Sequence, residues 1–185
     1  MNPAPGPDAV RLAWPAEAVA IAELQRRVWG SELAADVAEA MLGTVSTDEM
    51  AQAWEQAISR PPQARCRVLV AVQDGRVVGY ATTVPATDPD VEDGTDGEIQ
   101  EFAVDPPARS RGHGSRLLHA CADTLRADRF RRAVWWVVAT DEVLRGFLEA
   151  SGWAPDGSSR VIGTEDESVR LTQVRLHTDL GGPPE

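Results

Sequence analysis

Lysine is absent from this chain of 185 residues, so all 18 of its basic residues are arginines. A chain without lysine cannot form a lysine Schiff base, and it cannot build the phosphate-binding loop that requires Gly-Lys-Ser/Thr. Two cysteines, Cys66 and Cys121, are too few for a disulfide framework and show no metal-ligand spacing. We expect both to be buried free thiols, and we expect no bound metal.

Long apolar runs are also absent. No segment approaches the roughly 20 apolar residues that span a bilayer, and the first ten residues lack the basic and apolar regions of a secretory signal. The net charge of −11 argues against a general affinity for nucleic acid or for an anionic membrane surface. These absences predict a cytoplasmic protein without a nucleic-acid or membrane partner, and the length suits one domain with its own core.

Hydrophobic periodicity predicts a mixture of helices and strands. Ser46 and Glu49 have the spacing of a capping box, which predicts that a helix starts at Ser46, and Asp74-Gly75 is a typical hairpin turn. The other helices are expected within 15–30, 32–42, 115–125 and 141–153, and the strands within 9–14, 66–73, 77–84, 98–104, 133–139 and 168–178. The acidic segment 88–97 is expected to be a solvated loop. This order predicts a mixed sheet flanked by helices.

A glycine-containing turn, Arg109-Ser-Arg-Gly112-His-Gly114, lies between the strand at 98–104 and the helix that follows. Successive backbone N–H groups at the start of a helix bind anions, and glycines let a phosphate approach the backbone closely. A dinucleotide-binding fingerprint would need a third glycine where this chain has Leu117. The turn therefore predicts another phosphate ligand or an ordinary helix cap, and the motif alone does not choose between them.

The flanking segments make that choice. The sequence from strand through Val-Asp-Pro and Arg-x-x-Gly-x-Gly to an amphipathic helix resembles the GNAT superfamily of acyl-CoA-dependent N-acyltransferases. The apolar strand at 133–139 and the segment Phe147-Leu-Glu-Ala-Ser-Gly152-Trp153 follow in the family's order. The resemblance covers roughly residues 8–178. It implies an α/β (α+β) GNAT fold whose central mixed, mostly antiparallel sheet of six to seven strands is flanked by helices. We expect one domain over 1–185, with disordered tails at 1–7 and 179–185.

The resemblance also implies an activity. It implies an acetyltransferase that transfers the acetyl group of acetyl-CoA to a primary amine of a small molecule or peptide, by direct attack in a ternary complex. Dimers are common in the resembled family, so a homodimer stays open. The residues that would bind acetyl-CoA are Phe102, Ala103, Val104, Arg109, Ser110, Arg111, Gly112, His113, Gly114, Ser115, Asp141 and Phe147. For His113 we expect the backbone N–H to bind and the ring to face solvent.

An alkylammonium ion has a pKa near 10.4, so the amine must lose a proton before it attacks. Glu98 is the first candidate base, because a glutamate stands at the same distance before the glycine motif in the histone-modifying branch of the family, and Glu101 is the second. Leu148 departs from the family, which often has at this position a tyrosine that protonates the departing thiolate. This departure keeps an alternative open, a non-catalytic or weakly active acyl-CoA-binding regulatory module.

Overall fold

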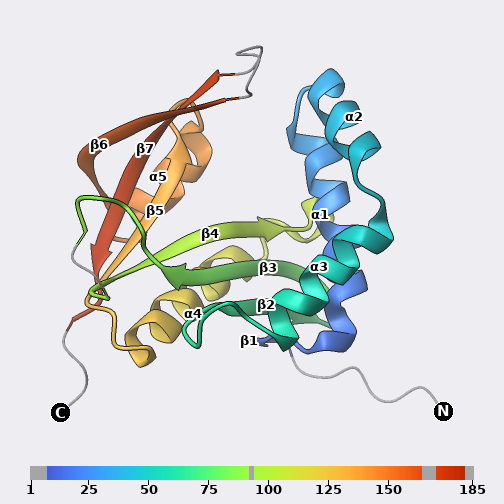
Figure 1. Cartoon of the computed structure of the whole chain (residues 1–185), viewed down its shortest axis with the longest axis horizontal. Coiled ribbons are helices and arrows are strands. Elements are labelled where there is room, and N and C mark those ends of the chain that lie inside the picture. Colours follow the sequence, from blue (N-terminus) through green and yellow to red (C-terminus); the bar gives the residue numbers. More distant parts are fainter. Residues whose placement is uncertain (1–7, 92–93, 164–169, 182–185) are drawn as a thin grey trace. The chain divides into compact units, whose positions relative to one another are not determined.

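The computed structural model describes residues 8–91, 94–163 and 170–181 (Figure 1). Its helices, of which η1 and η2 are short 3-10 turns, are η1 Pro15–Glu17, α1 Ala18–Glu32, α2 Ala35–Thr44, α3 Thr47–Ser59, η2 Pro106–Ala108, α4 His113–Ala127 and α5 Glu142–Ala150. Its strands are β1 Ala9–Leu12, β2 Arg67–Gln73, β3 Arg76–Pro85, β4 Asp96–Val104, β5 Arg132–Val138, β6 Ala154–Gly163 and β7 Arg170–Asp179.

Hydrogen bonds order the seven described strands as β1-β2-β3-β4-β5-β7-β6. β4 and β5 pair in parallel, whereas β1 with β2, β2 with β3, β5 with β7 and β6 with β7 pair antiparallel. The predicted fold class, a mixed and mostly antiparallel sheet flanked by helices, is thereby confirmed. The sequence analysis did not predict strand β6. Its Pro155 and Gly157 are residues that strands seldom contain.

Backbone contacts divide the chain into two compact units. Unit 1 is Met1–Thr83 with Glu101–Cys121, and unit 2 is Val84–Gln100 with Ala122–Glu185. Strand β4 and helix α4 contribute residues to both units. The expectation of one domain over 1–185 stays a prediction.

Unit 1 is built on the hairpin of β2 and β3, which α1 and α3 cover on one face (Figure 1). Asp74 and Gly75 both have positive φ, 50° and 75°, as the predicted two-residue hairpin turn requires. The core joins the two layers through Trp54 of α3 and Tyr80 of β3, whose rings meet edge to face at 5.1 Å. Ser46 and Glu49 form the predicted capping box at the start of α3.

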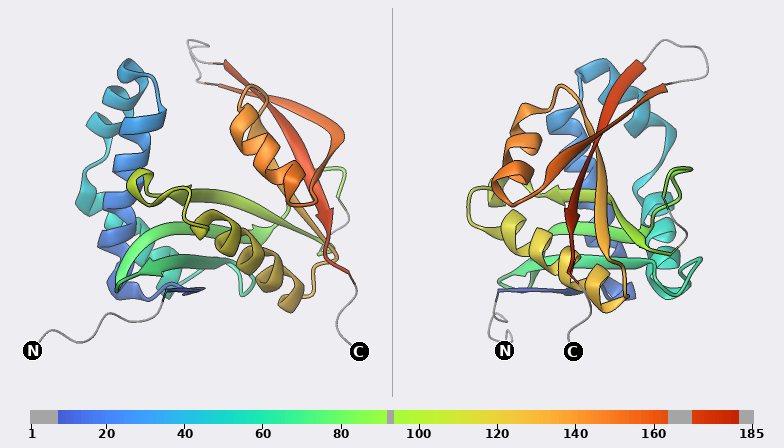
Figure 2. Two further views of the ribbon diagram at one scale, coloured as in Figure 1. Left: turned by 180° about the vertical axis from the view of Figure 1, so that it is seen from behind. Right: turned by 90° about the vertical axis from the view of Figure 1, so that its left-hand side faces the viewer.

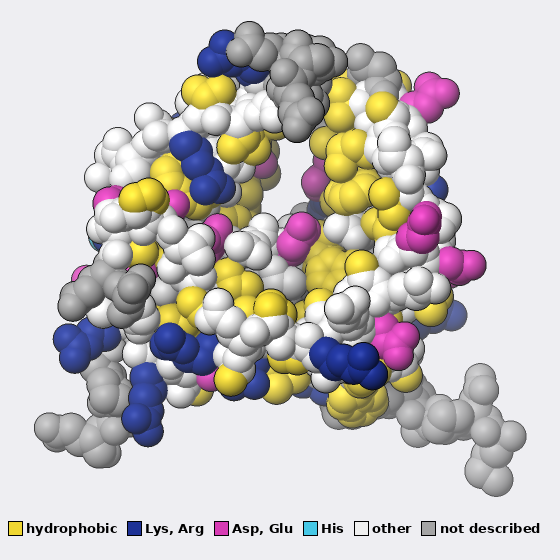
Figure 3. Space-filling model, in the orientation of Figure 1, with side chains coloured by type: hydrophobic (Ala, Val, Ile, Leu, Met, Phe, Trp, Pro, Cys, Tyr) yellow, Lys and Arg dark blue, Asp and Glu magenta, His cyan; other side chains and the backbone are white. Residues whose placement is uncertain are grey.

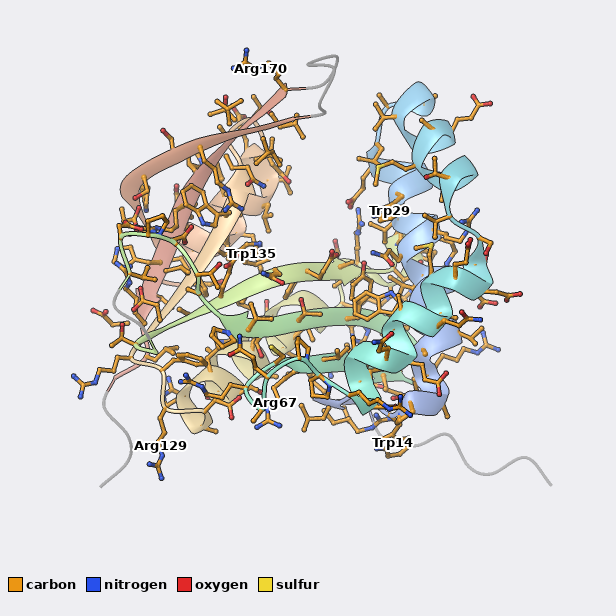
Figure 4. The ribbon with its side chains drawn as sticks, in the orientation of Figure 1. Trp14, Trp29, Arg67, Arg129, Trp135 and Arg170 are labelled. Atoms are coloured by element: carbon orange, nitrogen blue, oxygen red, sulfur yellow. The ribbon has the colours of Figure 1, made fainter. Side chains whose placement is uncertain are left out.

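Unit 2 is built on β5, β7 and β6, with α5 against one face (Figure 2). Trp135, which is labelled in Figure 4, meets Trp153 edge to face at 6.4 Å on that face. The predicted tail at 179–185 is wrong for its first residues, because Leu180 is buried and its N–H donates to the Arg131 carbonyl at 2.8 Å. Residues 182–185 and the predicted tail at 1–7 lie outside the described residues. No helix in the described ranges has both the length and the apolar character to cross a membrane.

Candidate functional site

The predicted phosphate loop lies in unit 1, between the end of β4 and the start of α4. Ser110 and Gly112 have positive φ, 60° and 81°, so the backbone turns twice before α4 begins at His113. A Cβ added to Gly112 would meet no atom within 4 Å, and the residues from Arg109 to Gly112 are exposed. The helix start therefore presents its first N–H groups next to an open stretch of backbone, which is the arrangement that phosphate binding requires.

The arginines of the loop differ in their pairing. The Arg109 Nε donates to the Val104 carbonyl at 3.0 Å, and its Nη2 forms an ion pair with the Glu32 carboxylate of α1. Arg111 makes no ion pair with any residue that the structure describes, and it lines a cavity of about 1020 Å³ with Gln73 and Arg76. The positive charge of Arg111 is thus available to an anion, whereas that of Arg109 is partly balanced.

The position of His113 contradicts one expectation from the sequence, that its ring faces solvent. Its ring does not face solvent, because only 2% of the residue is exposed. One ring nitrogen, Nδ1, lies 3.1 Å from Arg116 Nη2, and the other, Nε2, lies 3.2 Å from Gln73 Oε1. Arg116 can only donate, so Nδ1 accepts and the Nε2–H donates to Gln73. Burial and the charge of Arg116 lower the pKa of His113. The ring therefore ties the first turn of α4 to the end of β2.

The two candidate bases differ in their surroundings. Glu98 lies in unit 2 and is 7% exposed, and no hydrogen bond or ion pair reaches its carboxylate from the described chain. Burial raises the pKa of Glu98, and the nearby charge of Asp88 adds to this effect. Glu101 lies in unit 1 with an exposed side chain, and desolvation raises its pKa as well. Of the two residues, only Glu98 is more than nine-tenths buried, and its carboxylate has no partner among the described residues.

Strand β4 also carries the residues predicted to bind the pantetheine arm. Its pairing with β5 covers Asp96 to Glu98, although β4 itself continues to Val104. On β3, a Cβ at Gly79 would lie 3.0 Å from the Ala103 carbonyl oxygen, so the absence of a side chain there lets the two backbones approach closely. Phe102 and Val104 are half-buried and Ala103 is buried. Backbone contacts of these three residues stay a prediction.

Helix α5 contains the remaining predicted residues, and its local hydrogen bonds occupy them. The Asp141 carboxylate accepts from the Leu144 N–H at 2.9 Å and caps the helix. Leu148 is fully buried, and Phe147 is half-buried. The Ser151 hydroxyl, a candidate proton donor, donates to the Phe147 carbonyl at 2.8 Å. We find no free proton donor on the described α5 at or next to the position of Leu148.

A group of charged side chains that the sequence did not indicate surrounds Glu98 in unit 2. Glu98 pairs with Val134 of β5, and Trp136 lies two residues further on the same side of that strand. The register continues from Trp136 to Arg175 of β7. We call this side of the unit the Glu98 face.

Asp88 belongs to the segment 88–97 that was expected to be a solvated loop. This expectation is wrong for its first residues and for Asp96 and Gly97, which are buried at the start of β4. The Trp136 Nε1–H donates to both Asp88 carboxylate oxygens, at 3.2 and 3.0 Å. Arg175, which is 3% exposed, binds Asp90 and Asp156 at 2.8 and 2.7 Å, and Asp88 at 3.3 Å. These partners raise the pKa of Arg175 further. No sequence spacing links 88–90 to Arg175, so periodicity could not find the cluster.

The two cysteines and the other side chains that could bind a metal form no further site among the described residues. Cys121 is buried, and burial raises the pKa of its thiol to about 12, which leaves it unreactive at neutral pH. Cys66 is half-buried instead of buried as expected. Within the described ranges, His, Cys, Asp and Glu side chains nowhere gather in the groups of three or more that hold a metal ion.

Comparison with known proteins decides the family. The model of the acetyltransferase (GNAT) family matches residues 20–153. The chain belongs to the GNAT acetyltransferase family. The match includes the loop from Arg109 to Ser115 and both candidate bases.

Individual GNAT relatives agree with this assignment. Over 79 residues the chain is 38% identical to a mycothiol acetyltransferase of Thermomonospora curvata, and the matched stretch covers 43% of this chain and 25% of that enzyme. An N-acetyltransferase of Staphylococcus aureus Mu50 superposes with a TM-score of 0.72 at 18% identity, over 95% of this chain and 100% of the other. A phosphinothricin acetyltransferase of Sinorhizobium meliloti, in complex with acetyl-CoA, superposes with a TM-score of 0.70 at 20% identity, over 96% and 94%. The two structures show a shared fold.

Proposed function

We propose that this GNAT chain is an N-acetyltransferase that transfers the acetyl group of acetyl-CoA to a primary amine of a small molecule or peptide. The observation that carries the proposal is Glu98, a residue that is 7% exposed and whose carboxylate has no hydrogen-bonding or ion-pairing partner among the described residues. Burying a charge without a partner costs free energy, so a purely structural carboxylate would normally have one. A bound amine would supply the missing partner.

The loop of unit 1 fits the pyrophosphate of acetyl-CoA. Gly112 combines a φ of 81° with open space where a side chain would stand, and α4 starts at the next residue. The loop can therefore surround a phosphate oxygen with backbone N–H groups. Family membership supports this ligand, and so does the acetyl-CoA complex of the Sinorhizobium meliloti relative.

Each residue then has a defined task in the transfer. Acetyl-CoA supplies an acetyl thioester, whose C–S bond breaks as the C–N bond to the amine forms. Glu98 takes the proton of the ammonium group directly or through water, and its raised pKa brings it closer to that of the amine it deprotonates. The main chain of Phe102 to Val104 holds the pantetheine arm. The thiolate, with a pKa near 8.5, leaves without a protein acid and takes its proton from water.

A second function is favoured by α5. Leu148 has no proton to donate and is fully buried, and the hydroxyl of Ser151 is bound to the Phe147 carbonyl. These two observations fit a module that binds acyl-CoA and responds to it without turning it over.

Thiol release from acetyl-CoA across a panel of amines, together with CoA binding by calorimetry, separates the two functions. We expect both binding and turnover. Binding without turnover would favour the regulatory module, and a chain that does not bind CoA would refute both.

Gly112→Asp tests the loop directly. A carboxylate placed beside the pyrophosphate should lower CoA affinity by at least about tenfold, or ~1.4 kcal/mol, because of charge repulsion. Gly181→Asp is the matched control, since Gly181 also has a positive φ, 73°, and open space around its Cβ position. It carries the same backbone strain without a phosphate nearby, so its CoA affinity should not change. Equal losses of CoA affinity in the two variants would show that backbone strain causes the loss. That result would contradict the proposal that this loop binds the pyrophosphate.

A further inference from the structure

On the Glu98 face, most charged side chains already form hydrogen bonds or ion pairs with other residues of unit 2. Arg175 uses its Nε, Nη1 and Nη2 atoms on Asp156, Asp90 and Ser158, with Asp88 as a further acceptor. These bonds account for the donors of a buried guanidinium and leave nothing for a ligand.

The next arginine on this face is occupied along one edge. The Nε and Nη2 atoms of Arg132 both bind Asp96 Oδ2, at 2.7 and 2.6 Å, and its Nη1 lies 4.0 Å from Asp156 Oδ2. Arg175 is therefore unavailable to a substrate, and Arg132 is held by Asp96 through two of its three nitrogens.

Arg160 of β6 is the most weakly paired of the three, because only its Nε has a hydrogen-bond acceptor among the described residues. Its guanidinium lies over the Trp136 ring, with Cζ 4.3 Å from the ring centroid, and its Nε donates to Gln173 Oε1 at 2.8 Å. Its Nη1 is 3.8 Å from the Asp88 carboxylate, which is beyond hydrogen-bonding distance. The side chain is 41% exposed. Stacking fixes the plane of the group, while the Nη1 and Nη2 edge has no hydrogen-bonding acceptor in the described part of the chain.

Two groups of opposite charge on one face thus lack full partners, the carboxylate of Glu98 and the free edge of Arg160. Trp136, on which Arg160 lies, is two residues along β5 from Val134, the residue that pairs with Glu98, and on the same side of the strand. The positive charge of Arg160 acts on Glu98 and lowers its pKa, against the larger effect of burial. An amine and a carboxylate a few bonds apart would complement both groups together.

We propose that the acetyl acceptor is an amino acid or a similarly short amine that carries a carboxylate, with its amine at Glu98 and its carboxylate on the free edge of Arg160. This inference rests on the proposed function, because it names the substrate class of the same site. The planar edge of a guanidinium matches a carboxylate by two parallel hydrogen bonds, so Arg160 determines acceptor specificity.

The test compares three acceptors of equal chain length: an ω-amino acid, its amide and the corresponding ω-amino phosphonate. With the wild-type chain we expect kcat/KM for the amino acid to exceed that for the amide by about tenfold or more. Arg160→Gln should remove this preference through KM, with little change in kcat or in CoA affinity. Arg160→Lys, which keeps the charge but loses the planar edge, should recover part of the preference.

Arg129→Gln is the matched control, because Arg129 is exposed in the turn before β5 and points away from unit 2 (Figure 4). It should leave all three acceptors unchanged. Acetylation of amino acid and amide at equal rates in wild type, or no effect of Arg160→Gln, would overturn the inference while leaving the proposed function intact. A preference for the phosphonate would overturn the assignment to a carboxylate. CoA binding without acetylation of any amine would overturn the proposed function and this inference with it.

Discussion

At the scale of single residues, Glu98 shows how a site can weaken the fold that contains it. The residue is buried, its carboxylate has no hydrogen-bonding partner in the described chain, and burial raises its pKa. A carboxyl group whose pKa is higher in the folded than in the unfolded state favours folding below its ordinary pKa. This contribution is lost as the pH rises through the folded-state pKa. Wherever Glu98 is ionised, it therefore destabilises the folded protein.

Glu98→Gln should consequently have opposite effects on activity and stability. Turnover should fall at pH 7 because the base is lost, while the melting temperature at pH 7 should rise because a neutral amide replaces a buried charge. At pH 4.5, where the raised pKa keeps the wild-type carboxyl largely protonated, the two melting temperatures should converge. Thermal unfolding at both pH values measures this. Glu149→Gln, at an exposed site on α5, should change neither quantity, and a stability gain that is equal at both pH values would contradict a titrating Glu98.

At the scale of the elements, the sequence predicted the parts that local chemistry determines. Asp74-Gly75 and the Ser46–Glu49 pair act within a few residues, so turn and cap could be predicted. Strand β6 was not predicted because Pro155 and Gly157 interrupt its pattern, whereas the contacts of Arg175 join segments far apart in the chain, which periodicity does not encode. His113 was misjudged for the same reason, since Gln73, its partner, is 40 residues away. The predicted loop and base follow from a motif, whereas the Glu98 face required the register of β4, β5, β7 and β6.

The packing of β4 against α4 depends on Gly97, the neighbour of Glu98. A Cβ added there would lie 2.4 Å from Leu125 Cδ2 and 2.9 Å from a ring atom of Phe130, and both side chains are buried. Gly97→Ala should therefore destabilise the fold by about 1–3 kcal/mol through overpacking. Denaturant unfolding checks this against Gly146→Ala in α5, where the added Cβ meets nothing within 4 Å. That variant should gain up to about 1 kcal/mol from better helix propensity, and losses of similar size in both would refute the packing argument.

At the scale of the whole molecule, the net charge of −11 opposes the approach of an anion such as CoA. On the face drawn in Figure 3, acidic and basic side chains are interspersed with apolar ones over both units. The local charge around the loop, more than the total charge, should therefore govern CoA binding. Within unit 1, the charge of Arg109 is balanced by its ion pair with Glu32.

Removing that pair should strengthen CoA binding. Glu32→Gln frees the Arg109 guanidinium, so CoA affinity at low ionic strength should rise several-fold. This gain should shrink in high salt, where the Debye length falls from about 10 Å at 0.1 M to about 3 Å at 1 M. Glu55→Gln, at an exposed site on α3, is the matched control because it changes the net charge by the same single unit. Calorimetric titrations with CoA at low and high salt distinguish the two. If both variants gain equally, the total charge governs binding; if only Glu32→Gln gains, the loop arginine does.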